Sequence, residues 1–117
     1  MVLDVEAGAA TMEGAIEWTR AMHSHGMKRP CLYVSLARAS PLVKYLTYRG
    51  VPRDTFRLWT AHWTGRAHLC GESCGFYGER PGATQWTNEP MGKHYDESIA
   101  SHAWLVALAN DYAQAGR

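Results

Sequence analysis

Two hydrophobic periods alternate along the chain. Short runs rich in β-branched and aromatic residues predict four strands, at residues 1–6, 31–36, 56–63 and 83–87. Between these runs, apolar residues recur three and four positions apart, which is the period of an amphipathic helix. One helix is predicted at 12–26. A second is predicted to begin with Ser40 as N-cap and Pro41 as first helical residue, and to end at Gly50.

The carboxyl-terminal part adds a turn-rich loop at 65–82 and a last helix at 98–114. The residues expected on one face of this helix are Ile99, Ala103, Val106, Ala109 and Ala113. Strands that alternate with helices indicate βα units, in which each crossover covers one face of a parallel sheet. We therefore predict a single α/β domain over residues 1–117. The alternation of strands and helices alone does not distinguish an open sheet from part of a closed barrel.

Composition narrows the class of protein. Hydrophobic residues make up 46% of the 117 residues and charged residues 20%, which is typical of a globular domain and not of a disordered chain. Twelve Lys and Arg oppose eleven Asp and Glu, a formal charge of +1, so nothing favours nucleic acid or an anionic membrane as partner. The first residues lack the basic and apolar regions of a secretory signal, so we expect synthesis in the cytoplasm without a signal peptide of its own.

Two carboxylates end the first predicted strand. Asp4 and Glu6 are two residues apart, so their side chains point to the same side of an extended chain. Ligands gather at the carboxyl ends of parallel strands, and two neighbouring acids can separate their pKa values so that one stays protonated. Glycoside hydrolysis requires this division of roles. The alternative is an ordinary solvent-facing pair at a strand end.

Aromatic residues follow on the later strands. Trp59 and Trp63 share one face of the third predicted strand, Tyr33 lies on the second, and Trp86 lies on the fourth. Such rings stack on the apolar faces of sugars, but their spacing alone favours core packing. Asp96 is either a further carboxylate of the same cleft or an acid at a helix N-terminus, where the helix dipole favours it.

The cysteines allow several interpretations. Cys70 and Cys74 have CxxxC spacing, and His62, His68 and His94 lie elsewhere in the chain. A zinc site needs four ligands, usually in recognisable pairs, and no second cysteine pair is present. We expect free thiols first, a disulfide clipping the loop second and zinc third; we therefore expect no metal. Cys31 lies on an apolar strand, which gives no reason to predict a nucleophile.

Taken in order, the segments LDVE, CLYVS, LWTAHW, ATQWT and YDES resemble the carboxyl-terminal half of a glycoside hydrolase family 25 lysozyme, or muramidase, in its phage-lysin-like and actinobacterial versions. The resemblance covers residues 2–98. It implies parallel βα units that form half of a modified TIM-type (β/α) barrel. It also implies hydrolysis of the β-1,4 bond between N-acetylmuramic acid and N-acetylglucosamine in peptidoglycan.

The same resemblance implies residue roles. Glu6 matches the general acid, and Asp4 matches the carboxylate that orients the acetamido group of the substrate. Asp96 matches an acid near the last strand, although YDES replaces the VDLN-like run of the family. The residues that match the substrate groove are Tyr33, Trp59, Trp63, Gln85 and Trp86. No metal or organic cofactor is implied.

One departure from the family concerns the first half of the barrel. Family members carry further βα units before the DxE strand, whereas this sequence starts on that strand. An incomplete barrel exposes strand edges and an apolar inner face, so we expect a homodimer or a separately supplied amino-terminal half. The expected site of action is the bacterial cell wall. One alternative is a non-catalytic cell-wall glycan-binding module or an inactive fragment, and another is a small metal-binding α/β protein organised by Cys70, Cys74 and nearby histidines.

Overall fold

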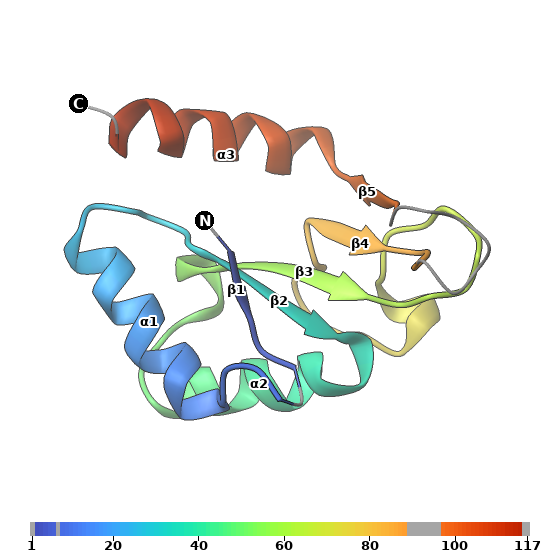
Figure 1. The fold of residues 1–117 in the computed structure, drawn as a ribbon, viewed down its shortest axis with the longest axis horizontal. Helices are drawn as coiled ribbons and strands as arrows, with labels where there is room; N and C mark the ends of the chain where they lie inside the picture. The colour runs from blue at the N-terminus through green and yellow to red at the C-terminus, as the bar shows by residue number, and fades with distance from the viewer. Residues whose placement is uncertain (1, 7, 89–96, 116–117) are drawn as a thin grey trace.

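A five-stranded sheet forms the centre of the molecule in the computed structural model, which describes residues 2–6, 8–88 and 97–115 (Figure 1). The strands are β1 (Val2–Asp4), β2 (Cys31–Ser35), β3 (Arg57–Ala61), β4 (Ala83–Gln85) and β5 (Ser98–Ala100). They lie in chain order, and β1 to β4 are parallel. The prediction of an α/β fold with a parallel sheet is therefore confirmed. The fifth strand was not predicted and pairs antiparallel with β4.

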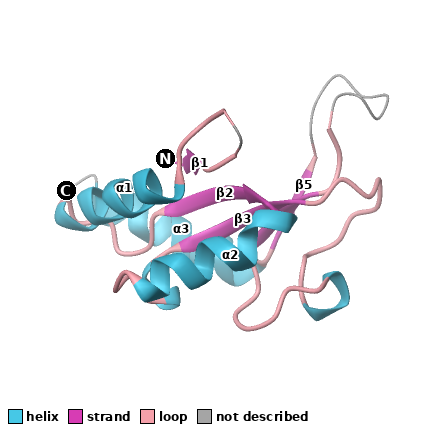
Figure 2. Cartoon of the chain, turned by 90° about the horizontal axis from the view of Figure 1, so that it is seen from below, coloured by secondary structure: helices cyan, strands magenta, loops and turns pink. Residues whose placement is uncertain are grey.

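Three helices flank the sheet: α1 (Met12–Ser24), α2 (Leu36–Tyr48) and α3 (His102–Ala115). Figures 1 and 2 show α1 and α2 on one side of the sheet and α3 on the other. Short 3₁₀ turns occur at Arg53–Thr55 and Glu72–Cys74. Across the described ranges, no helix combines the length and the apolar character needed to cross a bilayer.

The core lies between the sheet and the first two helices. Leu32, Val34 and Leu58 are fully buried on the face of the sheet that α1 and α2 cover. The helices contribute apolar side chains at helical spacing, such as Ile16 and Leu42, which are also fully buried. Because side chains alternate along a strand, Tyr33 and Trp59 point to the opposite face and are only half buried. This second face carries the candidate chemistry.

Helix α2 begins earlier than its sequence predicts. It follows β2 directly, with Ser35 as N-cap, and Pro41 lies inside the helix. The prediction of an N-cap at Ser40 was therefore wrong. The apolar side chains of Ala39 and Leu42 are fully buried, and their packing outweighs the hydrogen bond that a proline nitrogen cannot donate.

The predicted start of the last helix was also wrong. Ser98 and Ile99 belong to β5, and α3 begins at His102. The expected apolar face is not the packed face, because Val106 is 45% exposed. Trp104 and Ala107 are half buried instead. The Trp104 ring lies against the backbone of Gly82, whose N–H donates to the Leu58 carbonyl.

The connection from β3 to β4 differs from the two before it. Helices α1 and α2 form the crossovers from β1 to β2 and from β2 to β3, whereas residues 62–82 form a loop whose regular structure is the single 3₁₀ turn Glu72–Cys74. Phe76 anchors this loop in the core with 3% of its surface exposed. The Arg80 guanidinium donates to the carbonyls of Leu69 and Cys70. The loop is thus tethered by side chains rather than by a helix.

Candidate functional site

The predicted acids and aromatics meet on the face of the sheet opposite α1 and α2. Asp4, Tyr33 and Trp59 occupy the same register position on β1, β2 and β3. Neighbouring strands lie about 4.8 Å apart, so these three side chains stand side by side on one face. The Val5 N–H donates to the Tyr33 carbonyl, which extends the pairing beyond β1 toward Glu6. Glu6 therefore follows Asp4 on the same face at the carboxyl edge.

The two carboxylates have different surroundings. Asp4 is exposed, whereas Glu6 is half buried. Burial raises the pKa of the Glu6 carboxyl above its ordinary value of 4.5, and the charge of Asp4 and a hydrogen bond with Asp4 raise it further. The Arg38 guanidinium acts in the opposite direction but is the smallest of these causes. The surroundings of Glu6 therefore favour its protonated form.

A hydrogen-bonded aromatic cluster borders the carboxylates. The rings of Tyr33 and Trp59 are in edge-to-face contact, with centroids 5.1 Å apart. The Tyr33 hydroxyl and the Trp63 indole both donate to Oε1 of Gln85, the latter over 3.2 Å. The Trp59 indole donates to the Ser98 hydroxyl at 3.1 Å, which explains one role of the unpredicted strand β5. Four of the predicted groove residues are therefore brought together.

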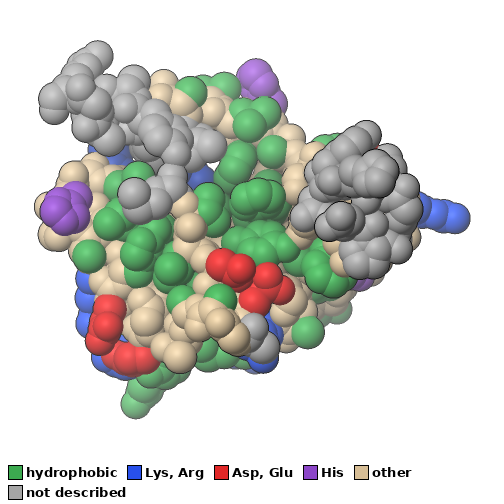
Figure 3. Space-filling model, in the orientation of Figure 1, with side chains coloured by type: hydrophobic (Ala, Val, Ile, Leu, Met, Phe, Trp, Pro, Cys, Tyr) green, Lys and Arg blue, Asp and Glu red, His purple; other side chains and the backbone are tan. Residues whose placement is uncertain are grey.

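The members of this cluster differ in how far they are exposed to solvent. Gln85 is only 5% exposed, whereas Trp63 is 49% exposed. Figure 3 shows hydrophobic side chains gathered on the face between β1 and α3, with acidic side chains beside them over β1. An apolar surface next to a carboxylate pair suits a ligand with apolar ring faces and polar linkages. A glycan has this character.

Two predicted site residues stand apart from the cluster. Trp86 is half buried and comes one residue after Gln85, where an extended chain points its side chain to the opposite face. Its backbone N–H donates to the Glu97 carbonyl. Its place in a groove stays a prediction. Asp96 lies outside the described residues.

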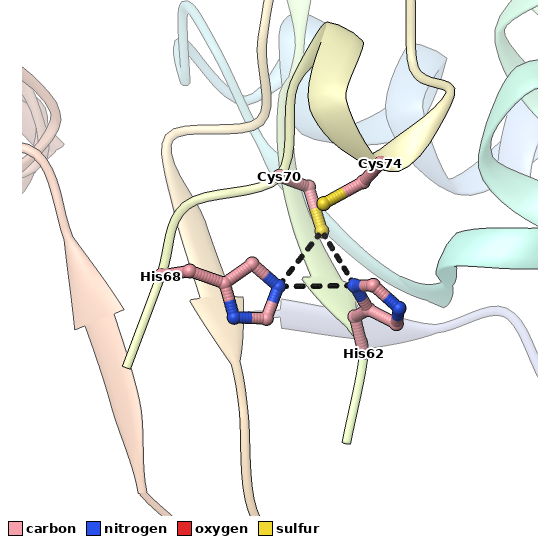
Figure 4. Close-up of side chains that lie close together, drawn as sticks. All are labelled: His62, His68, Cys70 and Cys74. Carbon is pink, nitrogen blue, oxygen red and sulfur yellow. Dashed lines mark hydrogen bonds between the residues drawn. The ribbon is translucent and has the colours of Figure 1, made fainter. Parts of the chain in front are cut away.

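A second cluster lies at the end of β3 and combines His62, His68, Cys70 and Cys74 (Figure 4). One potential ligand atom from each residue lies within 4.8 Å of all the others. His62 Nδ1 is 3.0 Å from His68 Nε2. The Cys70 sulfur is 3.8 Å from His62 Nδ1 and 3.9 Å from His68 Nε2.

Backbone contacts fix three of these residues. The His62 N–H donates to the Gln85 carbonyl, which continues the pairing of β3 with β4. The Cys70 N–H donates to the buried Thr84 hydroxyl at 2.9 Å. Cys74 ends the 3₁₀ turn, whose C-cap Gly75 has a φ of 81°, a conformation that favours glycine. The loop thus directs all four side chains toward one point.

The protonation chemistry of the cysteines and histidines follows their burial. Burial lowers the pKa of His62, and the neighbouring His68 lowers it further. Burial raises the pKa of the Cys70 thiol, and hydrogen bonds from the Thr60 and Thr84 hydroxyls oppose this shift. All three cysteines are free, so no disulfide joins Cys70 to Cys74. Burial raises the pKa of Cys31 to about 12, which excludes it as a nucleophile near neutral pH.

The sequence left this cluster as a minor alternative, a metal site organised by Cys70, Cys74 and nearby histidines, because His62 and His68 were not counted as the second ligand pair. The usable signal was the run H-x5-H-x-C-x3-C at 62–74, which places four soft or borderline ligands within 13 residues. His94, the third histidine considered, lies outside the described residues. The sequence spacing was therefore informative, but histidines had to be counted as a ligand pair.

Comparisons with known proteins leave the site to be interpreted from its own chemistry. No family model matches the chain, and neither a curated protein nor a solved structure matches it significantly.

Proposed function

We propose that this chain is a peptidoglycan-cleaving glycoside hydrolase of the lysozyme type, with Glu6 as its proton donor. The observation that carries the proposal is the placement of Glu6 beside Asp4, at the carboxyl edge of a parallel sheet and next to an aromatic surface, where burial raises the pKa of Glu6. A carboxyl that keeps its proton nearer to neutral pH can donate it to a leaving glycosidic oxygen.

The reaction assigns a separate task to each carboxylate. The Glu6 proton passes to the oxygen that links N-acetylmuramic acid to N-acetylglucosamine as the bond from that oxygen to C1 breaks. Water then adds to C1: its hydroxyl stays on the new reducing end, and its other proton returns to the Glu6 carboxylate. Asp4 orients the acetamido group of the substrate and stabilises positive charge that develops at the sugar ring. No metal or organic cofactor enters these steps.

Substrate binding uses the aromatic cluster. Sugar rings stack on the apolar surfaces of Tyr33, Trp59 and Trp63, which lie within the same hydrogen-bonded group. Gln85 accepts the two aromatic hydrogen bonds through Oε1, so neither bond uses the N–H donors of its amide. Those donors suit a sugar hydroxyl or an acetamido carbonyl.

The sheet is proposed to be half of a modified TIM-type (β/α) barrel. Its first four strands are parallel and in chain order, and both α1 and α2 cover the same face. A barrel keeps its crossover helices on one face in this way, whereas a doubly wound sheet places crossover helices on both faces and reverses its strand order. The face with Asp4 and Tyr33 then corresponds to the inside of the barrel. The antiparallel β5 and helix α3 depart from the repeat.

The test is release of reducing sugar from purified peptidoglycan. We expect release by the wild-type chain and a loss of about 10²- to 10⁴-fold in Glu6→Gln, which keeps the shape of the side chain but has no acidic proton to transfer. Glu17→Gln on the exposed face of α1 is the matched control and should act like wild type. Equal release by Glu6→Gln and wild type would contradict the role of Glu6.

Binding to insoluble peptidoglycan separates catalysis from recognition. Wild type and Glu6→Gln should bind with the same affinity. Trp63→Ala should bind at least about 10-fold more weakly, because it removes an exposed stacking surface. Binding that depends on Trp63 without any release of sugar would instead identify a non-catalytic cell-wall glycan-binding module. The absence of both binding and sugar release would overturn both functions.

A further inference from the structure

We infer that His62, His68, Cys70 and Cys74 form a structural zinc site that holds the loop between β3 and β4. No role in glycan cleavage is assigned to these four residues, so the inference is independent of the proposed function. The site is closed: four protein ligands are available, the number that a structural zinc ion uses.

The distances between the ligand atoms agree with tetrahedral zinc. Zinc–nitrogen bonds of about 2.0 Å and zinc–sulfur bonds of about 2.3 Å place neighbouring ligand atoms roughly 3.3 to 3.8 Å apart. The two His nitrogens are 3.0 Å apart, and the Cys70 sulfur lies 3.8 and 3.9 Å from them. Adjustments of a few tenths of an ångström accommodate the ion at these three ligands. Cys74 completes the set within the same 4.8 Å limit.

The surroundings of His68 prepare it for metal binding. Its Nδ1 is 2.7 Å from the Arg66 carbonyl, which can only accept a hydrogen bond. Nδ1 therefore carries the proton, and the Nε2 lone pair points toward His62 and Cys70. A metal-bound histidine whose other nitrogen donates to a backbone carbonyl is the usual arrangement around protein metal sites.

The sulfur and nitrogen ligand atoms favour zinc over magnesium or calcium. Two thiolates and two imidazoles in a tetrahedral arrangement suit zinc better than magnesium or calcium, which prefer oxygen ligands. On binding, the two cysteine thiols each release a proton to solvent. The two thiolate charges then balance the charge of Zn²⁺, so the filled site is neutral. This neutrality suits a site in which Cys70 is fully buried.

The position of the cluster explains what the ion would do. The β3-to-β4 crossover lacks the α-helix that the two preceding crossovers have. An ion bound by His62 at the end of β3 and by Cys74 in the 3₁₀ turn ties the two ends of a 13-residue segment together. The ion would add to the order that Phe76 and Arg80 already give this loop, as structural metals do in small folds.

The first measurement is metal content and cobalt spectroscopy of the purified wild-type chain. We expect one zinc per chain by elemental analysis. Replacement of zinc by Co²⁺ should give intense d–d bands of tetrahedral cobalt together with thiolate-to-cobalt charge transfer. Removal of zinc with a chelator should lower the melting temperature, and added zinc should restore it.

Substitutions then identify the ligands. Cys74→Ser and His68→Ala should lose stoichiometric zinc and the four-ligand cobalt spectrum. Cys31→Ala and His25→Ala are matched controls, because Cys31 lies on β2 and His25 is exposed at the end of α1, both outside the cluster. These controls should retain one zinc per chain.

Two results would overturn the inference. A folded wild-type chain that takes up no zinc when the ion is supplied under reducing conditions has no such site. Zinc that persists at one per chain in both Cys74→Ser and His68→Ala is bound elsewhere. The cobalt spectrum of the wild-type chain decides the case even if a variant fails to fold, because octahedral cobalt without thiolate charge transfer excludes this ligand set.

Discussion

The surroundings of Glu6 in the folded protein disfavour the charged form of its carboxyl. Burial and the neighbouring Asp4 both favour the protonated carboxyl, and this preference is the property that makes Glu6 a proton donor. The same preference affects stability, because the pKa of Glu6 in the folded chain is higher than its ordinary value of 4.5. Between the ordinary and the raised value, the folded state binds more protons than the unfolded state. The free energy of unfolding therefore falls as pH rises through this interval.

We accordingly expect Glu6→Gln to be more stable than wild type at neutral pH, since glutamine carries no charge to bury. Below the ordinary pKa of 4.5 the wild-type carboxyl is protonated in both states, so the difference should vanish. Urea unfolding across a pH series measures the effect. Glu17→Gln, on the exposed face of α1, should show no such pH dependence. A constant difference between Glu6→Gln and wild type at every pH would contradict the assigned environment.

At the scale of elements, Gly82 determines how α3 attaches to the sheet. A Cβ atom on Gly82 would lie 1.9 Å from a ring carbon of Trp104, so no larger residue fits without a shift of the indole. The Ser101 N–H also donates to the Gly82 carbonyl at 2.8 Å. The backbone of Gly82 thus contacts the Trp104 ring and also accepts a hydrogen bond from Ser101, the residue before α3.

Gly82→Ala should destabilise the chain by about 1–3 kcal/mol through overpacking. In a Trp104→Ala background the same substitution should cost much less, because the ring that it meets is gone. A double-mutant cycle measured by urea unfolding gives the coupling between the two positions. Equal costs in both backgrounds would show that Trp104 does not press on Gly82.

Pro41 provides a second prediction for an element. In an α-helix its nitrogen would face the Ala37 carbonyl, but proline has no N–H to donate. Pro41 is exposed, so Pro41→Ala removes no buried contact. We expect a gain of about 2 kcal/mol in the free energy of unfolding, the restored helix bond being partly offset by the freer unfolded chain. A loss of stability would mean that the proline is favourable where it lies.

The errors in predicting these elements have physical causes. The rules that place a proline at the first position of a helix are local, whereas α2 is held by the burial of Ala39, Leu42 and Leu46 against the sheet. Similarly, Ser98 and Ile99 read as helical residues in isolation, but pairing with Gln85 and Thr84 makes them a strand. Tertiary contacts, which local periodicity does not encode, decided both boundaries.

At the scale of the whole molecule, the sheet has an edge strand at β1. Its described pairing is with β2 alone, and Val2 is 43% exposed there. Together with the apolar face shown in Figure 3, this edge favours association with a second copy or with a complementary barrel half. Light scattering after size exclusion should find a dimer, or a monomer that binds such a half. A monomer that melts cooperatively and associates with nothing would contradict the barrel proposal.

The site residues on the strands could be predicted from the sequence, whereas those that depend on strand register or on the loop path could not. The acids and aromatics were found because strand alternation places Asp4, Tyr33 and Trp59 on one face, a property of local sequence. The grouping of Gln85 with Trp63 needed the β4 register, and the histidine pair needed the path of the β3-to-β4 loop. Loop paths depend on tethers such as Phe76 and Arg80, whose partners lie elsewhere in the chain.

The attachment of α3 has a consequence for the order in which the protein opens. Among its described side chains, Trp104 and Ala107 are half buried and Leu105 and Val106 are exposed, whereas α1 and α2 each bury several residues completely. We therefore expect helix α3 to detach while the sheet and the other helices stay folded. In deuterated solvent its amide protons should exchange through this partial opening, well before those of β2 and β3. One face of the sheet would be uncovered each time, without any global unfolding.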